Sequence, residues 1–316
     1  MTLVYKFSDN VKKEIIKYYK DKVREKTPPH AVFQAKDNDT VITLYESGKI
    51  MFQGVSADVD ANVWKALEMK LNNKDISKEE KEKENKEIEE NKEENIDYTL
   101  LSTIGSDEVG TGDYFGPIVV TASYVSKDNI EFLNSLNVRD SKNITDSYIR
   151  NIAPKIMERI PHVTTILNNE LYNKPNVNLK QVLAISHNLA IYNLLNKGKY
   201  SYAKIIVDKF CSKENYYNYL EGQKNIVKYA TFITKAENKV LSVAVSSIIS
   251  RYIFLREINK LSDSLHIPLK KGADKDVEKI GKEIVEKYGE DKLKYVAKLN
   301  FKNTKRILDI EDKTKK

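Results

Sequence analysis

The 316 residues of the chain are 41% hydrophobic and 31% charged, proportions that suit two globular domains with a heavily solvated surface. No run of about 18 apolar residues occurs, which excludes a transmembrane helix, and the net charge of +7 favours a polyanionic partner. The single cysteine and four histidines exclude a disulfide framework and a zinc finger, fit a reducing cytoplasm, and leave oxygen atoms as the ligands of any metal ion.

The charges divide the chain into three parts. Residues 74–94 contain six lysines against ten acidic residues and almost no apolar ones, so we predict a charged linker that is either a single helix or disordered. Residues 1–73 carry a net charge of +2 and residues 95–316 a net charge of +9. We therefore predict two domains, at 1–73 and 95–316, and expect the basic one to bind nucleic acid, although lysines that only solvate the surface explain the same excess.

The first domain is predicted to be a small α+β unit. A helical pattern follows Ser8, with Val11 and Ile15 on its apolar side, and Pro28-Pro29 then interrupts the chain. Three short strands, at 31–36, 40–45 and 49–53, precede a second helix at about 61–71. These elements predict one curved antiparallel sheet that is backed by helices.

The second domain has the alternation of an α/β fold. Strands are predicted at 100–106, 117–125, 203–207 and 229–233, and helices at about 146–159, 178–196 and 238–261. Carboxylates stand where these strands end, which predicts a functional site at one edge of the sheet.

Four acidic residues are the candidate metal ligands. Asp107 and Glu108 end an apolar strand, Asp208 ends another, and Glu237 opens a long apolar helix. Burial penalises such charges unless a cation is present, and Mg²⁺ and Mn²⁺ prefer carboxylate oxygens. Taken singly, Asp208 is equally well explained as a strand-end cap and Glu237 as a favourable charge at a helix N-terminus.

The motifs around these acids resemble those of type 2 ribonucleases H, and most closely the ribonuclease HIII subgroup. The matching segments are GSDEVGTGDYFGP at 105–117, VRDSK at 138–142, IIVDKF at 205–210 and KAENKVLSVAVSSIISRY at 235–252. The N-terminal unit, which includes YESGKIMFQG at 45–54, resembles the subgroup's domain related to TATA-binding protein. The resemblance implies the ribonuclease H fold, a mixed sheet flanked by helices, preceded by this small α+β domain.

The resemblance also implies an activity and a ligand set. Members of the family hydrolyse the RNA strand of RNA–DNA hybrids with two divalent ions, Mg²⁺ or Mn²⁺, and leave 5′-phosphate and 3′-hydroxyl ends. Its metal-ligating acids match Asp107, Glu108, Asp208 and Glu237, and Glu at the last position favours HIII over HII. Two ions about 4 Å apart can clamp a scissile phosphate without a histidine base. The chain departs from the family at Asn300, where we expect histidine in Lys-Leu-His-Phe.

The loop Gly110-Thr111-Gly112 is the candidate reader of RNA. Its glycines allow the backbone to approach a minor groove, where the 2′-hydroxyl distinguishes RNA from DNA, and the family uses this loop in that way. A side chain at position 112 would block that approach, and a positive φ angle there would also require glycine. Ser141 and Lys142 are further candidates, as phosphate contacts.

Two other functions remain open from the sequence. One is cleavage at single ribonucleotides in duplex DNA, as in the HII subgroup, and the other is a non-catalytic protein that binds hybrids. Intact acids argue against a binding protein, because negative charge beside phosphates weakens binding. We expect a monomer whose partner is an RNA–DNA hybrid and not a membrane.

Overall fold

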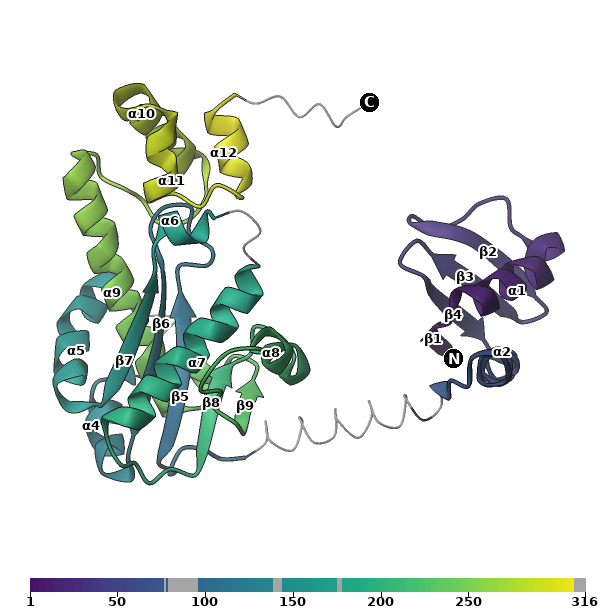
Figure 1. The fold of residues 1–316 in the computed structure, drawn as a ribbon, viewed down its shortest axis with the longest axis horizontal. Coiled ribbons are helices and arrows are strands. Elements are labelled where there is room, and N and C mark those ends of the chain that lie inside the picture. The colour runs from purple at the N-terminus through teal and green to yellow at the C-terminus, as the bar shows by residue number, and fades with distance from the viewer. Residues whose placement is uncertain (77, 79–95, 139–143, 175–177, 310–316) are drawn as a thin grey trace. The chain divides into compact units, whose positions relative to one another are not determined.

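The computed structural model of the chain describes residues 1–76, 78, 96–138, 144–174 and 178–309 (Figure 1). The chain divides into two compact units, Met1–Asn91 and Lys92–Lys316. Within the described ranges, no helix is long and apolar enough to cross a membrane. The segment predicted as a charged linker lies outside the described residues except for 74–76 and 78.

The first unit is built on a four-stranded antiparallel sheet in the order β1-β4-β3-β2. The predicted small α+β architecture is therefore confirmed, with one strand more than the sequence indicated, because Thr2–Lys6 pairs with the last strand of the sheet. The elements in chain order are β1 (Thr2–Lys6), α1 (Asp9–Tyr19), η1 (Lys20–Lys22), β2 (Ala31–Asp37), β3 (Thr40–Tyr45), β4 (Lys49–Gly54) and α2 (Ala57–Asn72).

Both helices of this unit pack on the same face of the sheet. The inward side chains of the strands and the apolar sides of α1 and α2 form one core, in which Ile42, Phe52 and Ile15 are fully buried. Ile76, which lies inside the segment predicted as a linker, is buried in this core as well. The buried carboxylate of Glu68 on α2 accepts hydrogen bonds from the backbone N–H and the hydroxyl of Ser8, at the start of α1, and thereby joins the two helices.

The second unit is built on a five-stranded mixed sheet in the order β7-β6-β5-β8-β9, which agrees with the mixed sheet that the resemblance implies. β5 and β6 form an antiparallel hairpin, whereas β5, β8 and β9 run parallel to one another. The elements through the last strand are β5 (Thr103–Val109), β6 (Ile118–Val125), η2 (Lys127–Asn129), α4 (Ile130–Ser135), α5 (Asp146–Arg159), β7 (His162–Leu167), α6 (Asn169–Tyr172), α7 (Leu179–Lys197), β8 (Lys204–Asp208), α8 (Lys213–Tyr219) and β9 (Ala230–Ile233). Those that follow are η4 (Ala236–Asn238), α9 (Leu241–Leu265), α10 (Lys275–Tyr288), η5 (Glu290–Lys292), α11 (Leu293–Val296) and α12 (Lys302–Ile307).

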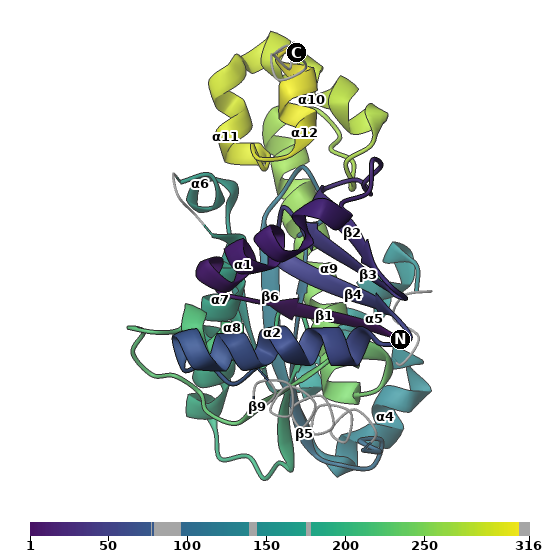
Figure 2. The same ribbon diagram turned by 90° about the vertical axis from the view of Figure 1, so that its right-hand side faces the viewer.

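Helices cover both faces of this sheet. α9 packs along β5 and β6 and is covered by α5, while α7 packs on the opposite face with α8 beside it. α10, α11 and α12 gather at one end of the unit, next to the C-terminal part of α9, in both views (Figure 1, Figure 2). The sheet is therefore buried on both sides, which explains its apolar strands.

The contact between α9 and β5 is unusually close and unusually polar. A Cβ atom at Gly105 would lie 2.3 Å from the backbone nitrogen of Val243, so only glycine fits at that point of the strand. Three fully buried serines, spaced four residues apart on α9, then bond to the sheet. Ser242 bonds to the hydroxyl of Thr103, Ser246 to the carbonyl of Gly105, and Ser250 to the carbonyl of Asp107. This serine ladder fixes the register of the helix against the strand.

Candidate active site

Asp107 and Asp208 lie opposite each other on neighbouring parallel strands. Ser106 of β5 pairs with Val207 of β8, so the residue after each occupies the same level of the sheet. Neighbouring strands are about 4.8 Å apart, and paired residues point to the same face. The two acids that the sequence placed at strand ends are therefore brought side by side.

The side chains of Asp107 and Glu108 leave opposite faces of β5, because side chains alternate along a strand. On the α9 side, the Ser247 hydroxyl lies near the Asp107 carboxylate and partly offsets the rise in its pKa. On the α7 side, Glu108 contacts His187, with 3.1 Å between Oε2 and Nε2. One Asp107 oxygen also accepts a hydrogen bond of 2.8 Å from the backbone N–H of Glu108. Two adjacent acids thus approach one site from different directions.

Glu237 reaches the site through a short 3-10 turn between β9 and α9. Lys235, just before that turn, has a left-handed backbone with φ of 54°, which redirects the chain from the strand. The backbone N–H of Ala236 donates a hydrogen bond of 2.8 Å to Asp208 Oδ1 and ties the turn to β8. Glu237 itself is buried.

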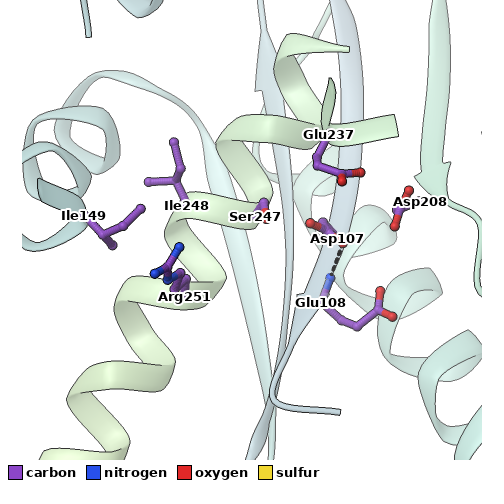
Figure 3. Close-up of a pocket in the computed structure, with 8 residues that line it drawn as sticks. All are labelled: Asp107, Glu108, Ile149, Asp208, Glu237, Ser247, Ile248 and Arg251. Atoms are coloured by element: carbon purple, nitrogen blue, oxygen red, sulfur yellow. Dashed lines mark hydrogen bonds between the residues drawn. The ribbon is translucent and has the colours of Figure 1, made fainter. Parts of the chain in front are cut away.

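The four acids line one cavity of about 370 Å³. Figure 3 shows their carboxylates turned toward a common region at the end of β5. The rest of the cavity wall is formed by α5 and α9, through Ile149, Ser247, Ile248 and Arg251. The structure therefore brings together residues that are up to 130 positions apart in the sequence (Asp107 and Glu237).

The electrostatics of the cavity fit a bound cation. Burial raises the pKa of Asp107 well above its ordinary value, and the negative charges of Glu108 and Asp208 raise it further. A divalent ion would reverse this effect, and four carboxylates are the oxygen-rich ligand set that Mg²⁺ and Mn²⁺ prefer. Among the residues that the structure describes, no three acidic, histidine or cysteine side chains are already spaced as the ligands of one ion. The carboxylates would have to draw closer when an ion enters.

The predicted RNA-reading loop lies at the turn from β5 to β6. Gly110 is buried, whereas Gly112 is exposed at the tip. The left-handed backbone is at Gly110, with φ of 103°, where a Cβ atom would lie 2.3 Å from the carbonyl oxygen of Pro117. The expectation of a positive φ at Gly112 is wrong, and a Cβ atom there would meet nothing within 4 Å. Glycine at 110 is required by the fold of the turn, while nothing in the turn itself requires glycine at 112.

The two predicted phosphate contacts, Ser141 and Lys142, lie outside the described residues. A described cation, Arg251, lies on the cavity wall. Its Nε and one terminal nitrogen donate hydrogen bonds of 2.9 and 2.6 Å to the same oxygen of Asp146. Lys271 bonds to the other oxygen of the same carboxylate. Arg251 is thus the cation that lines the cavity, and Lys271 shares its acidic partner.

Sequence reasoning missed His187 and Ser247, which contact the acids. His187 lies among apolar residues of α7, and Ser247 is one of several serines on α9, so neither stands out without the fold. The one usable signal was a histidine in the middle of a buried apolar helix.

Comparison with known proteins supports the resemblance seen in the motifs. A sequence profile of the Ribonuclease HII family matches residues 104–304, and a profile named Domain of unknown function (DUF3378) matches residues 2–77. The chain is 38% identical to Ribonuclease HIII from Lysinibacillus sphaericus over 96% of its own length and 97% of that protein. It is also 38% identical to Ribonuclease HIII from Geobacillus kaustophilus, over 93% of both chains.

Solved structures give the same assignment. The crystal structure of Bst-RNase HIII in complex with Mn²⁺ is 34% identical, superposes with a TM-score of 0.66, and covers 98% of this chain and 99% of that one. RNase H3 from Aquifex aeolicus, at 22% identity, shares the fold with a TM-score of 0.52 over 94% of this chain and 99% of that one. The chain belongs to the ribonuclease HIII family.

Proposed function

We propose that the chain is an endoribonuclease that hydrolyses the RNA strand of RNA–DNA hybrids with the help of two divalent ions, Mg²⁺ or Mn²⁺. One observation carries the proposal: four acids from three separate segments line a single cavity close to a glycine turn. A protein that only binds hybrids gains nothing from negative charge at this place, since the charge repels phosphates. The Mn²⁺ complex of Bst-RNase HIII supports a divalent ion as cofactor.

The acids hold the metal ions and orient them in this mechanism. When bound, the ions neutralise charge at the scissile phosphate and acidify a water molecule. Asp107 and Asp208 present their carboxylates on one face of the sheet, at the ends of β5 and β8. Glu108 presents its carboxylate on the opposite face, and Glu237 lies in the turn before α9. Arg251 lies on the wall of the same cavity, where its positive charge attracts the substrate backbone. The products carry 5′-phosphate and 3′-hydroxyl ends.

The Gly110–Gly112 loop selects RNA in this proposal. It joins the strand that carries Asp107 and Glu108, so any sugar that the loop contacts is held at a fixed distance from the metal site. The exposed backbone at Gly112 leaves room for a minor groove. We include Ser141 and Lys142 as phosphate contacts on the strength of the motif alone.

The N-terminal unit holds the hybrid in this proposal. Its helices cover only one face of its sheet, and the other face is free of helices within the described residues. That open face displays Lys6, Lys36 and Lys49, whose outward positions follow from the burial of alternate residues in β1, β2 and β4. A broad surface with lysines at its margins suits the backbone of a duplex. We also propose that the enzyme acts as a monomer in the cytoplasm, where the buried Cys211 stays reduced.

Cleavage of a labelled RNA–DNA hybrid in the presence of Mg²⁺, Mn²⁺ or a chelator tests the proposal. We expect cuts within the RNA strand only when a divalent ion is present. A parallel reaction on duplex DNA with a single ribonucleotide distinguishes this activity from the HII type. Efficient cleavage in the presence of chelator would contradict the metal-dependent mechanism, and faster cleavage of the single-ribonucleotide duplex would contradict the preferred substrate.

A further inference from the structure

His187 is a fully buried histidine in the middle of α7. Its ring is stacked on Phe210, with 5.2 Å between ring centres and 15° between the planes. Phe210 follows Asp208 by two residues, so the segment after β8 limits how the imidazole can turn. The orientation of the ring is thus fixed by packing before any polar contact is considered.

Both ring nitrogens of His187 bond to residues of β5. Nδ1 lies 2.7 Å from the hydroxyl oxygen of Ser106, and Nε2 lies 3.1 Å from Oε2 of Glu108. A carboxylate only accepts hydrogen bonds, so the hydrogen in the second contact belongs to Nε2. Nδ1 faces the Ser106 hydroxyl, which also lies 3.0 Å from the carbonyl oxygen of Thr121 and has one hydrogen for these two contacts.

The spacing of these contacts follows from the strand. Ser106 and Glu108 are two residues apart on β5 and therefore point to the same face, toward α7. One imidazole spans both, while Asp107 between them points to α9. The histidine thus contacts only one of the two adjacent acids.

We infer that His187 is a positioning residue that fixes Oε2 of Glu108 and so presents the other oxygen, Oε1, to a divalent ion. A glutamate side chain has several rotatable bonds, and a carboxylate near two like charges tends to turn away from them. A donor that is held by Phe210 and Ser106 restricts that motion before an ion binds. Residues that hydrogen-bond to metal ligands commonly fix the orientation of those ligands, and the loss of such a residue weakens metal binding about 10- to 100-fold. The inference rests on the proposed role of Glu108 as a metal ligand.

The decisive measurement is the affinity of the hybrid-free protein for Mn²⁺. The concentration of unbound Mn²⁺ is measured by electron paramagnetic resonance. His187→Leu removes the donor and keeps an apolar side chain of moderate size. His187→Gln retains an amide N–H at a similar reach. We expect Mn²⁺ affinity to fall about 10-fold or more in His187→Leu and much less in His187→Gln. Cleavage by His187→Leu should be lost at limiting Mn²⁺ and recovered at high Mn²⁺, with an unchanged KM for the hybrid.

Ser106→Ala tests the same inference while the imidazole is kept, and it serves if His187→Leu does not fold. We expect it to weaken Mn²⁺ binding in the parent but to have no further effect in the His187→Gln background, because the imidazole through which the serine affects Glu108 is absent there. Additive losses in that double variant would overturn the inference. So would parental Mn²⁺ affinity in His187→Leu, or a loss of cleavage that high Mn²⁺ does not restore.

Glu108→Gln separates this inference from the proposed function. If His187→Leu and Glu108→Gln both weaken Mn²⁺ binding, the inference and the metal role of Glu108 both stand. If Glu108→Gln weakens binding and His187→Leu does not, only the inference fails. Parental Mn²⁺ affinity in Glu108→Gln would overturn the metal role of Glu108, and the inference with it.

Discussion

Lys298 donates hydrogen bonds to the backbone oxygens of Asp113 and Gly116, at 2.7 and 2.6 Å from Nζ, although its side chain is wholly buried. Both oxygens belong to the segment that follows the Gly110–Gly112 loop. The backbone N–H of Gly116 also donates to Val296, so the C-terminal region supports this segment from behind. A buried ammonium group therefore stabilises the turn that carries the proposed RNA-reading loop.

The pH dependence of stability tests the state of this lysine. Burial lowers the pKa of Lys298 to about 7, below its ordinary value of 10.5. Between these values the unfolded chain binds more protons than the folded one, so this group makes the free energy of unfolding rise with pH. We expect the stability of the parent relative to Lys298→Met to increase from pH 7 to pH 10, by up to about 1.4 kcal/mol per pH unit.

Urea unfolding of both proteins at several pH values measures this difference, and groups that titrate alike in the two proteins cancel. A difference that is constant over the range would show that the two carbonyl oxygens hold the proton on Lys298 in the folded protein.

Asp107→Asn should remove activity and raise stability together. The loss of a proposed metal ligand should lower the cleavage rate by more than about 100-fold. In the metal-free protein the same change removes repulsion with Glu108 and Asp208, so the melting temperature should rise by a few degrees, about what 1 kcal/mol produces. Asp128→Asn, at an exposed position, is the matched control and should change neither quantity. An Asp107→Asn protein with parental activity in Mg²⁺ would remove Asp107 from the metal site.

The two glycines of the loop should respond differently to substitution. Gly110→Ala forces a side chain into a left-handed backbone and against Pro117, and should lower the free energy of unfolding by about 1–3 kcal/mol. Gly112→Val meets open space, so the protein should melt like the parent yet cleave hybrids poorly, because the branched side chain blocks the approach of a sugar. Melting curves and cleavage rates of both variants check this. Parental cleavage by Gly112→Val would place RNA recognition elsewhere.

Charge reversal on the open face of the N-terminal sheet should weaken hybrid binding. We expect Lys36→Glu and Lys49→Glu each to lower affinity, and to reduce the slope of log affinity against log salt by about 0.9 for each phosphate that the variant no longer neutralises. Lys70→Glu makes the same change on α2, which covers the other face, and is the control. Titration of a labelled hybrid in the presence of Ca²⁺ measures the affinity. Equal effects of all three changes would indicate an unspecific response to net charge.

The architecture could be predicted from the sequence because it depends on local patterns. Apolar runs that end in an acid marked β5 and β8, and the structure has Asp107 and Asp208 at those ends. β1 was missed because Thr2–Lys6 is short and is not joined to its partner by a turn; it pairs with β4, about 45 residues away in the chain.

The supporting residues of the site could not be predicted, because they depend on contacts between distant segments. His187 meets Glu108 across 79 residues, and Lys298 meets Gly116 across 182. A histidine within an apolar helix can be noticed in the sequence, but no local pattern shows which distant residue such a histidine or lysine contacts. The error at Gly112 has a similar origin, since the φ angle of a loop residue depends on how the turn is closed, here by the positive φ of Gly110.

The serine ladder limits how this enzyme can change. Gly105 leaves no space for a larger residue between α9 and β5, and Ser246 and Ser250 bond to the main chain of the strand rather than to the carboxylates. The register of α9 against β5 is therefore insensitive to most substitutions near the site. Under the proposed function, we therefore expect changes in substrate preference in the loop after β5, at Arg251 and in the N-terminal sheet, and not in the spacing of the four acids.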